Sequence, residues 1–283
     1  MAAPSSRPPI PTSTAFASAT TSSETLVLTA RFDALRARGR RALVCYATAG
    51  HPDPERSIAL WQGLEAAGAD VLEVGVPFSD PMADGPVIQA SSQTALSHGV
   101  TLEAALDLVS RARLGIPVVL FSYLNPLIAA GPGVLRRAAE AGVHGVLLTD
   151  LPVGSDPARE AWLGAGPLAF VRLVAPTTPP QRMAEIARHG RGFVYLISRL
   201  GVTGVSAQLP TDLPETIASL RAVCALPICV GFGISRPEQA RLLGAHADGI
   251  VVGSAIVRAA GESVDAAVAL ARELRGALDD RAS

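Results

Sequence analysis

An acidic side chain stands inside an apolar stretch of this sequence, and a second acid follows on the next loop. Glu73 interrupts the apolar run Val71–Val74, and Asp84 lies in a segment rich in proline and glycine. A carboxyl group in an apolar strand is unfavourable unless it is paired, protonated or used. Burial would raise the pKa of Glu73 and make it a proton donor near neutral pH. An acid satisfied by an arginine or by backbone donors is an equal alternative, and Asp84 alone is an ordinary turn acid.

Three glycine-rich segments further along the chain indicate a phosphate site. They are Gly201–Gly204, Gly231–Ser235 and Gly253–Ile256. Glycine lets backbone N–H groups approach an anion, Ser254 adds a hydroxyl, and the start of a short helix adds a favourable partial charge. Tight turns without a ligand are the alternative, and three such segments after neighbouring strands argue against it. The residues alone therefore predict an enzyme acting on a phosphate ester.

The residue types that are missing narrow the chemistry further. The chain has no lysine, which excludes a Schiff-base mechanism. The five histidines are scattered, with no His-x-His or Cys-x-x-Cys grouping, so no metal site is expected. A net charge of −1 argues against nucleic acid or a membrane as partner, and no apolar run is long enough for a membrane span. Cys45, Cys224 and Cys229 lie in apolar segments and are interpreted as reduced core residues of a cytoplasmic protein.

The elements that must position these residues alternate between strand and helix. Apolar runs without alternation indicate parallel strands that are buried on both faces. The predicted strands are Ala42–Ala47, Val71–Val74, Val118–Ser122, Gly145–Thr149, Ala169–Leu173, Phe193–Ile197, Ile228–Val230 and Gly249–Val252. Proline or a polar cap opens several of the helices between them, and Gly68, Gly142, Gly190 and Gly244 close four. The predicted helices are Pro54–Ala67, Leu102–Ala112, Val134–Ala141, Pro157–Leu163, Pro180–Arg188, Pro214–Val223, Pro237–Leu243 and Val264–Leu278.

Eight strand–helix units predict an α/β protein with a single (β/α)8 TIM barrel. The competing doubly wound sheet lacks its Gly-x-Gly-x-x-Gly motif after the first strand. Two more helices are expected, an extra N-terminal one at Ala30–Arg38 and one between Gly85 and Ser97. Residues 1–28 are predicted to be a disordered tail, and residues 29–280 the catalytic barrel. The active site of such a barrel lies at the carboxyl ends of its strands.

Two segments resemble a known family. Residues 73–86, Glu-Val-Gly-Val-Pro-Phe-Ser-Asp-Pro-Met-Ala-Asp-Gly-Pro, resemble the signature of tryptophan synthase α subunits. Residues 195–204, Tyr-Leu-Ile-Ser-Arg-Leu-Gly-Val-Thr-Gly, resemble the mobile loop of that family, and the likeness runs from about Arg31 to Arg275. The resemblance implies a carbon–carbon lyase of the last steps of tryptophan biosynthesis. Its reaction is the retro-aldol cleavage of indole-3-glycerol phosphate to indole and glyceraldehyde 3-phosphate.

The resemblance also implies roles for individual residues. Glu73 and Asp84 become the catalytic pair: Glu73 protonates C3 of the indole and takes the glycerol hydroxyl proton, and Asp84 accepts the indole N–H. Protonation turns the ring into its own electron sink, which fits a chain without lysine or a zinc site. The implied substrate-binding residues are Phe121, Tyr123, Leu147, Tyr195, Thr203, Gly204, Phe232, Gly233, Gly253 and Ser254. We further predict that the Gly201–Gly204 loop is a lid, held closed by a hydrogen bond from Thr203 to Asp84.

A partner is implied as well. Members of the family form an α2β2 heterotetramer with a β subunit that holds pyridoxal phosphate, so this chain is expected to hold no cofactor. The expected partner contacts are Pro77, Asp80, Asn125 and Pro126, although Asp80 fits an ordinary turn equally well. The family more often has Asp where His51 stands, and a small or polar residue where Leu200 stands. The first departure affects a partner contact and the second the closing of the lid.

Three other functions stay open at this level. A stand-alone indole-3-glycerol-phosphate lyase would need no β subunit. A catalytically idle relative would only activate the β subunit, and intact Glu73 and Asp84 argue against it. An isomerase or epimerase barrel would share only the phosphate site and would turn over ribulose phosphates.

Overall fold

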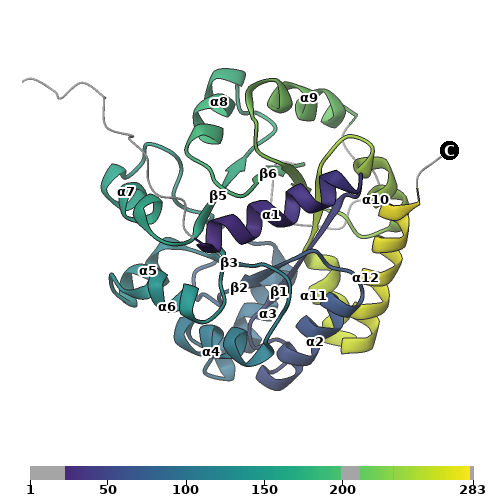
Figure 1. Cartoon of the computed structure of the whole chain (residues 1–283). Coiled ribbons are helices and arrows are strands. Elements are labelled where there is room, and N and C mark those ends of the chain that lie inside the picture. The colour runs from purple at the N-terminus through teal and green to yellow at the C-terminus, as the bar shows by residue number, and fades with distance from the viewer. Residues whose placement is uncertain (1–22, 199–210, 232, 281–283) are drawn as a thin grey trace, which may run out of the picture.

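The strands of this chain form a closed barrel. The computed structural model describes residues 23–198, 211–231 and 233–280, and in these ranges eight parallel strands surround one interior (Figure 1). Each strand pairs with the next along the chain, and the last pairs with the first. The predicted (β/α)8 TIM barrel is therefore confirmed. The strands are β1 Ala42–Thr48, β2 Val71–Gly75, β3 Val118–Ser122, β4 Gly145–Leu148, β5 Ala169–Val174, β6 Val194–Ile197, β7 Ile228–Gly231 and β8 Gly249–Val252.

The strands are buried on both faces, as their near-continuous apolar sequences predict. In β1, Val44 packs among the side chains of the barrel interior, whereas Leu43 and Cys45 pack outward among helix residues such as Trp61. Each predicted strand agrees with the observed one to within one residue at either end. The agreement follows from the physics of a covered parallel sheet, where no solvent-facing position interrupts the apolar run.

Helices surround the barrel and connect its strands (Figure 1). They are α1 Ser23–Ala37, α2 Pro54–Ala66, α3 Pro86–Ser97, α4 Leu102–Ala112, α5 Leu124–Ala129, α6 Val134–Glu140, α7 Pro157–Ala165, α8 Pro180–Arg188, α9 Leu213–Val223, α10 Pro237–Gly244, α11 Ser254–Glu262 and α12 Val264–Asp279. Gly68 and Gly142, each with φ of +98°, follow α2 and α6 as the predicted terminators. Gly244 is instead the last residue of α10, which ends one residue later than predicted.

Helix α1 differs most from its predicted bounds. It begins at Ser23 rather than Ala30, so residues 23–28 are helical although the sequence pattern assigns them to the tail. The reason is tertiary: Leu28, Phe32 and Leu35 lie on one face of α1 and fill the amino-terminal end of the barrel. The rings of Phe32 and Phe193 are 5.4 Å apart. The division at residue 28 otherwise stays a prediction.

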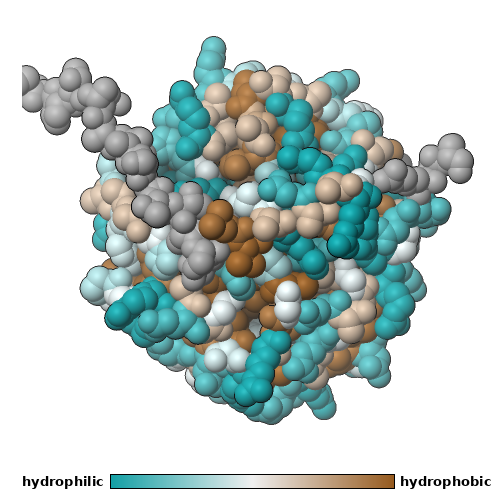
Figure 2. Space-filling view, in the orientation of Figure 1, coloured by the Kyte–Doolittle hydropathy of each residue, from teal (hydrophilic) through white to brown (hydrophobic). Residues whose placement is uncertain are grey.

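Two short helices were outside the predicted ranges. Helix α5 has six residues, too few for a helical period to show, and α11 is the short helix that a phosphate site after β8 requires. On the outside, apolar side chains gather at the start of α1 (Figure 2), where Leu26 and Val27 are exposed. The three cysteines are buried. Across the described residues, every helix is too short or too polar to cross a membrane.

Candidate active site

Glu73 lies in the interior of the barrel. It stands in β2 in register with Tyr46 of β1 and Val119 of β3, and it is 1% exposed. Neither carboxyl oxygen has a hydrogen-bond partner among the described residues, so the predicted alternative of an acid satisfied by an arginine or by backbone donors does not hold there. Burial alone raises the pKa of Glu73 to about 8. The group is therefore a protonated acid at neutral pH.

Asp84 lies at the rim, on the loop between β2 and α3. Its side chain is buried, and burial raises its pKa to about 6. The Tyr123 hydroxyl donates a hydrogen bond to Oδ2 of Asp84 at 3.1 Å, which acts against that rise. Gln89 holds the loop from the other side, because its Nε2 donates to the Asp84 carbonyl at 2.8 Å. At neutral pH the site thus pairs a protonated Glu73 with an ionised Asp84, two carboxyl groups in opposite states.

Tyr123 is held in place from two directions. Its ring packs against that of Phe78, with centroids 5.0 Å apart. It directly precedes α5, and the N–H of Leu124, the first residue of that helix, donates to Oδ1 of Asp150 at 2.8 Å. Sequence reasoning missed Asp150, because an acid after β4 has no distinguishing pattern until the neighbouring loop is in place. The carboxylate helps to fix the backbone that carries the Tyr123 hydroxyl.

The glycine-rich segments after β7 and β8 lie next to one another, because these two strands are paired. Gly233 has a φ of +84°, a conformation that favours glycine, and Gly253 immediately precedes α11. Ser254 is the first residue of α11, so its backbone N–H and hydroxyl are at the positive end of the helix. The predicted site residues Thr203, Gly204 and Phe232, together with the proposed lid and Leu200, lie outside the described residues.

Apolar and aromatic side chains share the barrel interior with Glu73. Leu147 and Tyr195 are buried in the interior cluster, and Phe121 packs against it. These three predicted residues are therefore brought together. Sequence reasoning missed Tyr46, which is 6% exposed and meets Phe121 edge-to-face with ring centroids 5.2 Å apart. A tyrosine in an apolar strand is typical of core packing, and its register with Glu73 appears only when the strands are paired.

This arrangement agrees with the comparison of the sequence with known families. Residues 32–279 match the family described as "Tryptophan synthase alpha chain".

The chain belongs to the tryptophan synthase alpha chain family.

Relatives of that name support the assignment along almost their whole length. The tryptophan synthase alpha chain of Alkalilimnicola ehrlichii is 48% identical over 260 residues, which cover 88% of this chain and 95% of the relative. That of Laribacter hongkongensis is 45% identical over 257 residues, covering 88% and 97%. Among solved structures, tryptophan synthase subunit alpha from Legionella pneumophila has 35% identity and a TM-score of 0.81, covering 89% of this chain and 98% of the other. Mycobacterium tuberculosis tryptophan synthase has 36% identity and a TM-score of 0.82, covering 89% and 97%.

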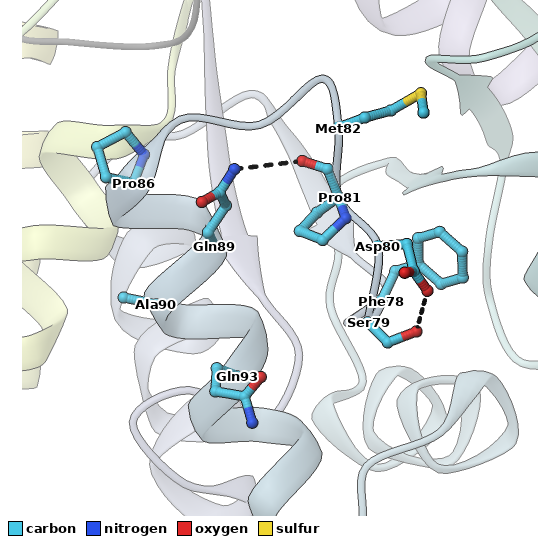
Figure 3. Close-up of a pocket in the computed structure, with 9 residues that line it drawn as sticks. All are labelled: Phe78, Ser79, Asp80, Pro81, Met82, Pro86, Gln89, Ala90 and Gln93. Atoms are coloured by element: carbon cyan, nitrogen blue, oxygen red, sulfur yellow. Dashed lines mark hydrogen bonds between the residues drawn. The ribbon is translucent and has the colours of Figure 1, made fainter.

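The partner contacts expected of a tryptophan synthase alpha chain lie in part on an open groove. The groove holds about 580 Å³ between the β2–α3 loop and α3 (Figure 3). Asp80 is exposed at its edge and accepts a hydrogen bond from Ser79 at 2.5 Å, and Met82 is 81% exposed. The groove is lined by Phe78, Ser79, Asp80, Pro81, Met82, Pro86, Gln89, Ala90 and Gln93.

The other expected partner contacts differ in how exposed they are. Asn125 is exposed and Pro126 is half-buried, both at the start of α5. Pro77 is buried within the chain itself. His51, where the resemblance leads us to expect Asp, is half-buried at the edge of a hollow of about 360 Å³ beside α3 and α11. Burial lowers the pKa of His51. In the part of the chain that the structure describes, no three His, Cys, Asp or Glu side chains are grouped to hold a metal ion.

Proposed function

We propose that this chain cleaves indole-3-glycerol phosphate to indole and glyceraldehyde 3-phosphate, with Glu73 and Asp84 as its catalytic residues. Its family comprises tryptophan synthase alpha chains, and the α reaction is a carbon–carbon lyase reaction of tryptophan biosynthesis. The observation that carries the assignment of roles is the opposite state of the two acids. Glu73 is buried, unpaired and protonated, while Asp84 is held ionised at the rim with help from Tyr123.

The proposed reaction starts with a proton transfer from Glu73 to C3 of the indole ring. The ring becomes positively charged, and Asp84 stabilises it by accepting a hydrogen bond from the indole N–H. The Glu73 carboxylate then takes the proton of the hydroxyl on the carbon attached to C3. The bond between these carbons breaks and its electron pair returns to the ring, which releases neutral indole. The other fragment leaves as the aldehyde.

The remaining predicted residues bind the two ends of the substrate. Gly233, Gly253 and Ser254 offer backbone N–H groups, a hydroxyl and a helix start to the phosphate. Phe121, Leu147 and Tyr195 offer an apolar wall to the indole, with Tyr123 at the mouth. We also retain Thr203, Gly204 and Phe232 as substrate contacts on the strength of the sequence pattern. The chemistry draws on no cofactor, since the protonated substrate is its own electron sink.

We further propose that the chain works in the cytoplasm as the α subunit of an α2β2 assembly, whose β subunit holds the pyridoxal phosphate. Pro77, Asp80, Asn125 and Pro126 are the proposed contacts. An exposed Met82 beside the open groove is consistent with this surface, because methionine is enriched at protein interfaces.

One assay tests the activity and the partner together. Indole release from indole-3-glycerol phosphate is measured with the chain alone and with a purified tryptophan synthase β subunit. We expect release that accelerates when β is added. Full activity without β and no further gain would favour a stand-alone lyase, and no release in either case would overturn the proposed reaction. Turnover of ribulose phosphates in place of indole-3-glycerol phosphate would identify an isomerase or epimerase.

A further inference from the structure

Strand β1 separates the two ends of the proposed site. It pairs with β8, which leads to Gly253 and Ser254, and with β2, which leads to the Asp84 loop. A ligand with its phosphate beside Gly253 and its ring beside Asp84 must therefore cross the carboxyl end of β1. The large inward-facing side chain at that end is Tyr46.

The contacts of Tyr46 reach both ends of this path. On the phosphate side, a Cβ atom added to Gly253 would lie 3.6 Å from the Cβ of Tyr46, and Val257 of α11 packs against the ring. On the other side, a Cβ added to Gly75 would lie 2.0 Å from the Tyr46 hydroxyl, so only glycine leaves room for it there. Ile88 of α3 completes the packing. The phenol thus lies across the path between phosphate and ring.

A chain of buried hydroxyl groups holds the Tyr46 hydroxyl in place. Ser91 donates its one proton to the carbonyl of Ile88 at 2.8 Å. Oγ1 of Thr48 lies 2.7 Å from the Ser91 hydroxyl and 3.4 Å from the Tyr46 hydroxyl, and either oxygen of each pair can be the donor. Whichever of Tyr46 and Thr48 donates, the phenolic oxygen keeps a free lone pair for the site. It is an acceptor for a donor that the ligand must bring.

We propose that Tyr46 is a specificity-determining residue whose phenolic oxygen accepts a hydrogen bond from the glycerol chain of the substrate. This inference rests on the proposed function. The hydroxyl next to the ring gives its proton to Glu73, so the second hydroxyl, which keeps its proton, is the donor. A ligand without that hydroxyl leaves the buried Tyr46 oxygen without its second partner, and the site discriminates against it.

The test compares ligands with and without hydroxyl groups. Glu73→Gln serves as the background, so that calorimetry can measure binding of indole-3-glycerol phosphate without turnover. Adding Tyr46→Phe should weaken this binding about three- to tenfold, the effect of losing one neutral hydrogen bond. Binding of indole-3-propanol phosphate, which has the ring and the phosphate but neither hydroxyl, should not change. Equal weakening of both ligands, or of neither, would overturn the proposal.

Thr48 supplies a matched control. Thr48→Val removes the hydroxyl that is hydrogen-bonded to the Tyr46 hydroxyl, whereas Thr48→Ser keeps it. We expect Thr48→Val to weaken binding of the hydroxylated ligand and Thr48→Ser to preserve it, with no further effect of Thr48→Val when Tyr46→Phe is present. Additive effects would contradict the hydroxyl chain. Thermal unfolding of each variant shows whether the fold is intact.

Turnover separates this inference from the proposed function. With Glu73 restored, Tyr46→Phe should raise KM for indole-3-glycerol phosphate more than it lowers kcat. A native chain that releases no indole, with or without β, would sink the proposed function. A native chain that does release indole, together with an unchanged KM in Tyr46→Phe, would sink only the role of Tyr46.

Discussion

The Tyr123 hydroxyl donates a 3.1 Å hydrogen bond to Asp84 while it accepts the N–H of Ala83, the residue just before that acid, at 2.9 Å. One phenol therefore holds both the carboxylate and the backbone of the same loop. Burial raises the pKa of Asp84, and the bond from Tyr123 lowers it, so the charge on Asp84 depends on the balance between them.

Tyr123→Phe should shift that balance. Without the hydroxyl, the pKa of Asp84 rises above about 6, and the acidic limb of the kcat/KM profile moves upward by about one pH unit. The alkaline limb serves as the internal control and should stay in place. Profiles of the native protein and the variant that superimpose on the acidic side would contradict the role of Tyr123.

The native protein should have a bell-shaped pH profile. Activity needs Asp84 ionised, which is lost as pH falls through about 6, and Glu73 protonated, which is lost as pH rises through about 8. The measurement is kcat/KM for indole release between about pH 5 and pH 9, a range that includes both limbs of the profile. A rate that keeps rising as the pH increases beyond about 8 would exclude Glu73 as the proton donor.

Glu73→Gln and Asp84→Asn should each lower kcat by about 10²- to 10⁴-fold, the usual effect of losing a general acid or base. Both changes preserve shape, so circular dichroism and the affinity for glycerol phosphate should match those of the native protein. A Glu73→Gln protein with more than half of the native activity would end the proposed mechanism.

Glu73→Gln should also change how stability depends on pH. The pKa of Glu73 is about 8 in the folded chain against an ordinary value of 4.5, so the folded state holds this proton more tightly than the unfolded state. Below the ordinary value the group has no effect, and it destabilises the native protein increasingly as pH rises towards 8. Denaturant titrations measure the free energy of unfolding of both proteins. Between pH 4 and pH 8, that of the variant should increase relative to that of the native protein by about 1 kcal/mol or more. A difference that is constant with pH would indicate that Glu73 is not a buried, unpaired acid.

Ser254→Ala should weaken the binding of glycerol phosphate by about three- to tenfold, because it removes a hydroxyl donor and leaves the backbone of α11 intact. Calorimetry measures the effect directly. Gly233 is a less clean position, since a side chain at its φ of +84° would strain the loop as well as obstruct an anion. Undiminished affinity in Ser254→Ala would place the phosphate elsewhere.

The barrel could be predicted from the sequence because buried parallel strands have long apolar runs, and because Gly68 and Gly142 mark helix ends. The additional turn at the start of α1 could not be predicted, since residues 23–28 are helical because Leu28 packs under the barrel. Helix α5 was too short to give a periodic pattern.

Some residues of the site could likewise be predicted from the sequence, and others could not. Glu73 could be found because an acid in an apolar strand is anomalous wherever it points. Tyr46 and Asp150 could not, because a tyrosine in a strand and an acid after one are ordinary. Their significance comes from partners far along the chain, Glu73 for one and Leu124 for the other, and strand register and loop contact are properties of the folded state.

Helix α1 closes the amino-terminal end of the barrel. Its residues Leu28, Phe32 and Leu35 fill that end. Substrate and product must therefore reach and leave Glu73 through the opposite rim. Asp80, a proposed partner contact, and Met82 are exposed at that rim. Substrate entry, product exit and the proposed subunit docking therefore use the same end of the barrel, so a partner bound there would control whether the product reaches the solvent.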